Sequence, residues 1–288
     1  MKSKPLDENS SPIDQRLLEW LEKQGYPLEM RVAKAFQAAG ARVIQSEYYV
    51  DPVREESREI DIVADWQQWF NHAIVTITFV IECKSSKDKP WILFVSPDAR
   101  LSDAARVAQR AASRLGQQVL STIARESSAQ DLFIFRLPDA PAYSITQAFT
   151  SSHDLCYAAA TTVASACSAQ ARAADRPPPQ ALKRLLNLEV VFPVLVTEAR
   201  LFEASLQQDS SVSLAERTSG VLLWRNPIVG LPHTIIHVLS LPALEQFIAE
   251  ARTSAERFIA LCASDYREAI EKATSTLLAS PVGERWLT

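Results

Sequence analysis

The stretch that decides the fold is Ile74-Val75-Thr76-Ile77-Thr78-Phe79-Val80-Ile81-Glu82-Cys83-Lys84, a β-branched run that ends in a Glu-x-Lys triplet. A long apolar run of this kind is typical of a strand that is buried on both faces. Residues two apart on a strand point to the same side, so Glu82 and Lys84 share one face while Cys83 points into apolar packing. The run therefore predicts a buried strand whose end carries a carboxylate and an ammonium group.

A second strand is predicted just before this run, over residues 58–66 (REIDIVADW), where polar and apolar residues alternate. The alternation predicts that Glu59 and Asp61 lie on one face and that Ile60 and Ile62 lie on the other. We expect Asp61 near the end of this strand, and Glu59 as a solvated neighbour.

If these two strands pair as a hairpin, Asp61, Glu82 and Lys84 converge at one edge of the sheet. Two carboxylates held close together need a cation between them. Oxygen ligands of this kind favour a hard ion such as Mg²⁺ or Mn²⁺. The competing interpretation is a pair of surface strands joined by an ordinary salt bridge. The apolar flanks of both strands indicate burial instead, and buried carboxylates are rarely found without a functional role.

The rest of the chain reads as an alternation of helices and strands. Two helices are predicted before the first strand, one from Pro12 to Gly25 and one from Pro27 to Gly40. Pro193 lies inside one predicted strand, which suggests a sheet edge or a bulge. Before the Glu-x-Lys triplet a further strand is predicted at 42–50. After it we expect helices at 102–124, 154–174 and 242–277. We also expect strands at 188–197, 200–206, 221–224 and 233–241.

Composition narrows the classes of function. The net charge is −4 and the pI is about 5.7, which counts mildly against a nucleic-acid binder. No Gly-rich phosphate loop, signal peptide or run of about 18 apolar residues occurs, so we expect a cytoplasmic protein with no membrane contact. None of the four cysteines forms a C-x-x-C pair, which gives no sign of a zinc site or a disulfide framework.

Two further patterns have modest weight. His233 and His237 form H-x-x-x-H, but the apolar residues around them favour a strand, so we expect a structural role. Basic residues cluster in sequence around the Glu-x-Lys region and could neutralise phosphates, although each alone is more often a surface charge. These basic residues are Arg31, Lys34, Arg54, Arg58, Lys87 and Lys89.

The pattern resembles the restriction-endonuclease-like, or PD-(D/E)XK, nuclease superfamily. The resemblance rests on Ile60-Asp61 and Glu82-Cys83-Lys84, each in an apolar strand, and on Glu29 in the preceding helix. It covers residues 25–90 well. Two features depart from the family pattern, because Ile60 replaces the proline before Asp61 and no Q-x-x-x-Y element of the RecB-like branch occurs.

The resemblance implies an α/β fold with a mixed central sheet flanked by helices. A nuclease-like core over 25–200, with an insertion around 91–150, would follow an N-terminal tail and helix (1–24) and precede a C-terminal β/α extension (201–288) packed on the core. By resemblance, Asp61 and Glu82 would bind metal together with the backbone carbonyl of Cys83. Lys84 would be the catalytic lysine, and Glu29 an auxiliary ligand or orienting group.

Two functions are left open by this resemblance. The first is a phosphodiesterase that uses Mg²⁺ or Mn²⁺ and acts on nucleic acid, most readily DNA. The second is a catalytically silent nuclease fold that serves as a nucleic-acid-binding or protein-binding subunit of a defence or repair assembly. A homodimer or a partner protein is compatible with either function.

Overall fold

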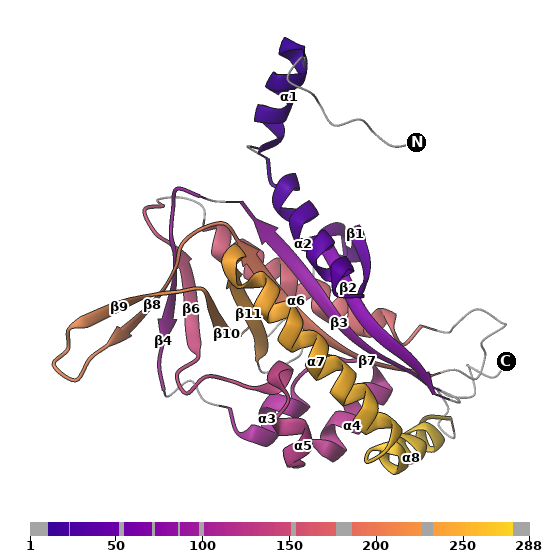
Figure 1. Ribbon diagram of the computed structural model, residues 1–288. Coiled ribbons are helices and arrows are strands. Elements are labelled where there is room, and N and C mark those ends of the chain that lie inside the picture. The colour runs from indigo at the N-terminus through magenta and orange to yellow at the C-terminus, as the bar shows by residue number, and fades with distance from the viewer. Residues whose placement is uncertain are drawn as a thin grey trace.

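The strand that ends in Glu82 and Lys84 lies in the interior of a large mixed sheet (Figure 1). The computed structural model describes residues 11–22, 24–51, 55–70, 73–85, 87–97, 101–150, 154–176, 186–225 and 233–278. Within these residues the sheet has eleven strands in the order β1-β2-β3-β7-β11-β10-β6-β4-β8-β9, with β5 paired to β7. Helices cover both faces, which confirms the predicted α/β class with a large mixed sheet.

The elements are bounded as follows. The strands are β1 (Arg42–Val50), β2 (Ser57–Phe70), β3 (Ala73–Lys84), β4 (Trp91–Val95), β5 (Ala111–Ala112), β6 (Ala142–Gln147), β7 (Leu186–Thr197), β8 (Leu201–Leu206), β9 (Val212–Arg217), β10 (Ser219–Trp224) and β11 (Thr234–Ser240). The helices are α1 (Pro12–Glu22), α2 (Tyr26–Ala38), α3 (Asp103–Ala108), α4 (Arg114–Ile123), α5 (Ser127–Gln130), α6 (Leu155–Ala173), α7 (Leu244–Ala263) and α8 (Arg267–Leu278), with short 3₁₀ turns η1 (Phe133–Phe135) and η4 (Leu241–Ala243).

Pairing in the first half of the sheet follows the prediction. β1, β2 and β3 form an antiparallel meander, so the expected hairpin of β2 and β3 is confirmed. β7 then lies parallel to β3 from Ala73↔Leu186 to Lys84↔Thr197. A parallel neighbour needs a long crossover, and α6 is the helix of that crossover that packs on the two strands. The predicted helix at 154–174 and strand at 188–197 are therefore confirmed.

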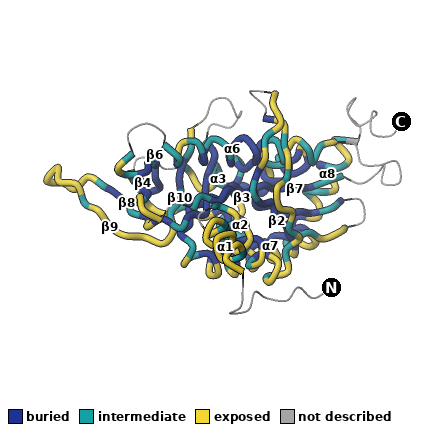
Figure 2. Tube along the Cα trace, turned by 90° about the horizontal axis from the view of Figure 1, so that it is seen from above, coloured by how far each residue is buried: buried dark blue, intermediate teal, exposed yellow. Residues whose placement is uncertain are grey.

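Two apolar layers hold the sheet between its helices. On one face, the side chains of β3 and β7 pack with α2, α4 and α7; on the other, they pack with α6. Figure 2 shows this arrangement, with buried residues along the sheet between α6 and α7. Burial on both faces explains why β3 and β7 read as almost continuous apolar runs.

Pro193 is not at a sheet edge, so the prediction from this residue is wrong. It lies inside β7, which pairs with β3 on one side along its whole length. On the other side β7 pairs with β5 only up to Val191 and with β11 only from Val194. Pro193 thus occupies the gap between two partner strands, where its missing N–H leaves no ladder bond unmade.

The predicted helix at 102–124 is two helices, because a second serine cap interrupts it. Ser102 accepts a hydrogen bond from the backbone N–H of Ala105 and begins α3, whereas Ser113 accepts from that of Gly116 and begins α4. The residues between the two helices form β5 and pair with β7. A side-chain acceptor at the N-cap favours a new helix start over continuation.

The predicted helix at 242–277 is also divided, into α7 and α8. The chain turns at 264–266, and this turn brings Tyr266 into the core, where it is 3% exposed. Its hydroxyl lies 2.8 Å from that of Ser128, so a tertiary contact has overridden the helical pattern. The predicted N-terminal tail, residues 1–10, and the position of Arg54 fall outside the described residues.

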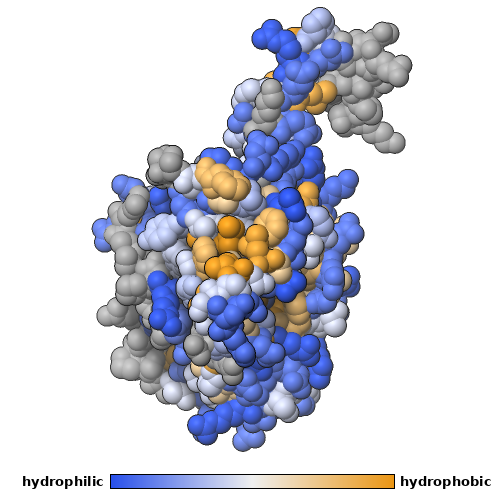
Figure 3. Space-filling model, turned by 90° about the vertical axis from the view of Figure 1, so that its left-hand side faces the viewer, coloured by the Kyte–Doolittle hydropathy of each residue, from blue (hydrophilic) through white to orange (hydrophobic). Residues whose placement is uncertain are grey.

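The second half of the sheet was less visible in the sequence. The strands predicted at 200–206, 221–224 and 233–241 are confirmed as β8, β10 and β11, whereas β4, β6 and β9 were not predicted. The hairpin of β8 and β9 projects at the far edge, away from β1 (Figure 1). On the side seen in Figure 3, apolar side chains gather on an otherwise polar surface, and Leu206, Val212 and Leu214 at this end of the sheet are exposed.

Candidate metal centre

The candidate site lies where β2 separates from β3. The last pair of their ladder is Ile62↔Ile81, whereas β3 stays paired with β7 as far as Lys84. Asp61 lies at this fork, inside β2 and not near its end as predicted. The backbone N–H of Cys83 has no β2 ladder partner at the fork and donates instead to Asp61 Oδ2, at 2.6 Å. This hydrogen bond fixes the carboxylate beside the end of β3.

A backbone irregularity in β1 faces Asp61. Ser46 has φ of 54°, in the left-handed region, and stands opposite Asp61 while the residues on either side keep their register with β2. The alternation of β2 breaks at this point, because Ile60 packs with the cluster on the α6 face and Ile62 with the cluster on the α7 face. The prediction that these two isoleucines share a face is therefore wrong, and the break opens β2 at the residue that carries the carboxylate.

Glu82 is the most deeply buried acid of the site, at 6% exposure. Its Oε1 accepts a hydrogen bond from Lys84 Nζ at 2.5 Å, while its Oε2 is buried with no hydrogen-bond partner in the described part of the chain. Burial raises the pKa of Glu82 to about 7; Lys84 lowers it and the nearby Asp61 raises it further. A buried carboxylate oxygen without a donor is uncommon in a native structure and calls for an explanation such as an ion.

The other charges of the site respond to Glu82 and to burial. Burial also raises the pKa of Asp61, although the Cys83 N–H and Lys84 oppose that shift. Burial disfavours the charged form of Lys84, but its attraction to Glu82, the hydrogen bond between them and the charge of Asp61 together raise its pKa above the usual value. Lys84 is therefore an ammonium group at neutral pH.

The structure also brings Glu29 to the site. It lies in the first turn of α2, half-buried. Burial raises the pKa of Glu29, and repulsion from Asp61 and then from Glu59 raises it further, while Lys84 lowers it. These interactions place the Glu29 carboxylate within the electrostatic reach of all three strand residues, as the sequence predicts. Cys83 is buried on the opposite side of β3 from Glu82, also as predicted.

The residues present fit a hard divalent cation. The described residues hold no cluster of three or more His, Cys, Asp or Glu side chains arranged for a metal. If an ion binds here, Asp61 and Glu82 would be its two protein carboxylates, with the Cys83 carbonyl and water as further oxygen ligands. Mg²⁺ is usually bound in this way, through one or two carboxylates and several waters. The unpartnered Oε2 of Glu82 is the observation that favours this fit.

One charged residue beside the site was not predicted from the sequence. Glu198 directly follows β7, and its side chain is 10% exposed. It binds Arg31 at 3.0 Å, Ser85 Oγ at 2.6 Å and Lys87 at 3.7 Å. No short-range pattern marks Glu198, because it comes beside the Glu-x-Lys end only through the parallel pairing of β7 with β3. Two of the predicted phosphate-binding cations are therefore already engaged by a carboxylate.

The remaining basic residues are dispersed. Arg58 pairs with buried Asp51 at 3.6 Å, whereas Lys34 and Lys89 are exposed. Next to the site an open groove of about 910 Å³ runs between α1 and the loop after β3, and Lys87 and Lys89 line it together with Gln147. Ser85, directly after Lys84, also lines this groove.

The other patterns have structural explanations. His237 is buried inside β11 and His233 precedes that strand, where it accepts a hydrogen bond from Arg225, so the H-x-x-x-H spacing does not fall on a helix. Asp154 caps α6 by accepting from the backbone N–H groups of Cys156 and Tyr157. The four cysteines are free and buried.

Within the described residues, no helix combines the length and apolar character needed to span a bilayer. The chain matches no family model, no curated protein and no solved structure.

Proposed function

We propose that this chain is a metal-dependent phosphodiesterase of the PD-(D/E)XK type that acts on nucleic acid, most readily on DNA. The observation that carries the proposal is the convergence of Asp61, Glu82 and Lys84 at the β2–β3 fork, with one buried Glu82 oxygen left without a donor. The order α2, β1, β2, β3, α6, β7 supplies the elements that this type of core requires. Under this proposal the segment 91–150 is an insertion that extends the sheet.

The residues take separate roles in this proposal. A bound Mg²⁺ or Mn²⁺ would acidify a water molecule and neutralise charge on the scissile phosphate. Asp61 and Glu82 would hold that ion, and Glu29 would orient a water beside it. Lys84 would position or activate that water, or donate to the phosphate oxygen. The four unpaired cysteines accord with a reducing compartment, so we place this activity in the cytoplasm.

A second candidate is a silent nuclease fold that binds nucleic acid or a protein. Three observations favour it: Lys84 is engaged by Glu82, Arg31 and Lys87 are engaged by Glu198, and the net charge is −4. A site whose cations are neutralised by carboxylates attracts phosphates less strongly. Under this candidate the apolar surface at the β8–β9 end would serve a partner protein or a second copy of the chain.

Cleavage of DNA decides between the two candidates. Plasmid DNA and single-stranded DNA are incubated with the purified protein and Mg²⁺ or Mn²⁺. We expect Lys84→Ala to lower the cleavage rate by about 100-fold or more, because a donor to the transition state is removed. Lys34→Ala, an exposed lysine of α2 outside the fork, is the matched control and should retain most of the rate. If the wild-type protein and Lys84→Ala cleave alike, the proposal is wrong and the silent fold is favoured.

A further inference from the structure

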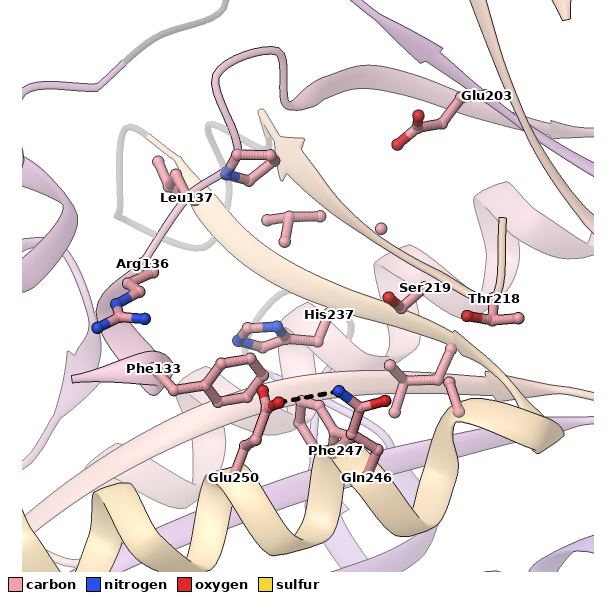
Figure 4. A pocket seen from close by; sticks show the side chains of 15 residues that line it. Phe133, Arg136, Leu137, Glu203, Thr218, Ser219, His237, Gln246, Phe247 and Glu250 are labelled. Carbon is pink, nitrogen blue, oxygen red and sulfur yellow. Dashed lines mark hydrogen bonds between the residues drawn. The ribbon is translucent and has the colours of Figure 1, made fainter. Parts of the chain in front are cut away.

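A second polar cavity lies between the C-terminal half of the sheet and α7. Its volume is about 350 Å³, within the range of small-ligand pockets, and β10, β11, η1, the segment after η1 and α7 all contribute to it. Figure 4 shows its side chains, with His237 and Phe133 on one side and Ser219 with Glu203 on the other. None of Glu29, Asp61, Glu82 and Lys84 lines this cavity, so it is separate from the candidate metal centre.

His237 lines the cavity and carries a ring nitrogen without a hydrogen-bond partner among the described residues. The residue is 4% exposed, and its Nε2 has no hydrogen-bond partner in the described part of the chain. Burial lowers the pKa of His237 to about 3, and the charge of Arg110 lowers it further. The imidazole is therefore neutral at physiological pH and offers one N–H donor and one nitrogen acceptor. This nitrogen lies at the wall of the cavity and can form a hydrogen bond with a group bound there.

The apolar part of the cavity is aromatic. The Phe133 ring is stacked on His237, with centroids 6.1 Å apart and planes at 24°. Phe247 contacts both rings, with its centroid 5.3 Å from that of His237 and 5.8 Å from that of Phe133. Flat aromatic walls favour a planar ligand, because such a ligand makes contact over its whole face.

The polar part of the cavity is rich in acceptors. Gln246 Nε2 donates to Glu250 Oε1 at 3.0 Å, which uses one of its two N–H groups (Figure 4). The second Glu250 oxygen and the Gln246 carbonyl can each accept a hydrogen bond. Glu203 is held by Arg217 at 2.7 Å. Arg136 also lines the cavity and can meet an anionic substituent. A ligand with N–H donors on its edge would find acceptors at Glu250 and Gln246.

We propose that this cavity binds an amino-bearing nucleobase, such as adenine or cytosine. The exocyclic amino group would donate to Glu250, the adjacent ring nitrogen would accept from the neutral His237, and the ring would lie on Phe133. Arg136 would contact a phosphate attached to the base. A uracil edge fits less well, because it places a carbonyl oxygen against the Glu250 carboxylate. This site stands on its own residues and does not depend on the phosphodiesterase proposal.

The test is binding of AMP, CMP and UMP to the full chain by calorimetry, together with a short single-stranded oligonucleotide of mixed sequence. We expect AMP or CMP to bind about tenfold more tightly than UMP, the effect of one well-placed hydrogen bond. His237→Phe keeps an aromatic ring but removes the nitrogen, and Glu250→Gln removes the charge at a partly exposed position; each should weaken binding about tenfold. Glu245→Gln, an exposed residue on the same helix outside the cavity, should bind normally.

The two nucleotide sources give different results. Binding of the mononucleotide without the oligonucleotide identifies a free nucleotide as the ligand. Oligonucleotide binding that both cavity variants weaken identifies a base within a nucleic-acid strand. Absence of binding by any base at millimolar concentration, or binding that both variants leave unchanged, overturns the proposal. Asp61→Asn should not alter nucleotide binding, so failure of the metal centre and failure of the cavity are distinguishable.

Discussion

Two buried glutamates on neighbouring strands of the same sheet have opposite surroundings. Glu189, near the start of β7, is 4% exposed and accepts hydrogen bonds from Thr78 Oγ1 at 2.7 Å, Gln170 Nε2 at 2.9 Å and Asn187 Nδ2 at 3.1 Å. Burial raises its pKa, and these three donors oppose the shift. The protein itself has completed the hydrogen bonding of Glu189, which identifies it as a structural group.

Glu82, near the end of β3, is buried to a similar degree but is only half satisfied. One oxygen is bound by Lys84 and the other has no donor among the described residues. Burial alone therefore does not distinguish a functional acid from a structural one. The number of hydrogen-bond donors that the chain supplies does distinguish them. A buried carboxylate oxygen without a donor is costly unless a group outside the chain binds it.

Replacement of each glutamate with leucine tests this comparison. Glu189→Leu leaves the buried Thr78 hydroxyl and two half-buried amides without this acceptor, and we expect it to lower the free energy of unfolding by about 3–5 kcal/mol. Glu82→Leu removes an unsatisfied oxygen and frees only the partly exposed Lys84, so in metal-free buffer it should cost less than about 1 kcal/mol. Urea unfolding of both variants measures the difference, and equal losses would contradict the assignment of roles.

The pH dependence of stability sharpens the comparison. The pKa of Glu82 is about 7 in the folded chain and 4.5 as a reference value, so the folded protein holds this proton more tightly. Protonated Glu82 therefore stabilises the folded chain fully below pH 4.5. This stabilisation is lost as the pH rises toward 7, by at most about 3 kcal/mol. Glu82→Gln lacks this loss.

We therefore expect the stability of Glu82→Gln relative to the wild type to rise between pH 5 and pH 7.5, by up to roughly 3 kcal/mol, in buffer that contains a chelator. Urea unfolding at three pH values measures this change. Parallel stability curves for the two proteins would show that Glu82 titrates like an exposed acid.

Addition of a metal ion tests whether a cation binds the Glu82 oxygen that has no donor among the described residues. An ion that binds only the folded chain should stabilise it by about 2.7 kcal/mol at a concentration 100 times its Kd. We expect Mn²⁺ to raise the Tm of the wild type and Asp61→Asn to abolish this rise. Asp65→Asn is the matched control, because Asp65 lies on the same strand but is held by Arg42 at 2.9 Å, away from the fork. A rise in Tm that persists in Asp61→Asn would place the ion elsewhere.

Local patterns in the sequence were sufficient for the strand end that carries Glu82 and Lys84. Alternation fixes their common face, and the apolar run fixes their burial. The fork at Asp61 was not predictable, since it depends on the left-handed Ser46 of β1 and on the residue at which the β2–β3 ladder stops. Glu198 reaches the site only through the long-range parallel pairing of β3 and β7, which no short-range pattern contains.

Other differences arose where tertiary contacts compete with a local pattern. The gap that accommodates Pro193 exists because two different strands share one side of β7. The turn between α7 and α8 exists because Tyr266 is drawn into the core. By contrast, Ser113 is recognisable in the sequence as a helix N-cap. The apolar periodicity continues across it, however, and predicts one long helix.

The smallest expected effect concerns this serine, which supports the Glu189 end of the sheet. Ser113 Oγ donates to the Asn187 carbonyl at 2.5 Å and accepts from the backbone N–H groups of Gly116 and Glu189, each at 3.1 Å. Ser113→Ala should lower the free energy of unfolding by about 1–2 kcal/mol, because a buried helix cap is lost.

Ser102→Ala is the control, since it removes the same kind of cap at an exposed position and should cost at the low end, about 0.5 kcal/mol. Neither variant should change the rise in Tm with Mn²⁺. If Ser113→Ala reduces that rise, the two ends of β3 and β7 are energetically coupled, and Glu189 contributes to the metal centre as well as to the fold.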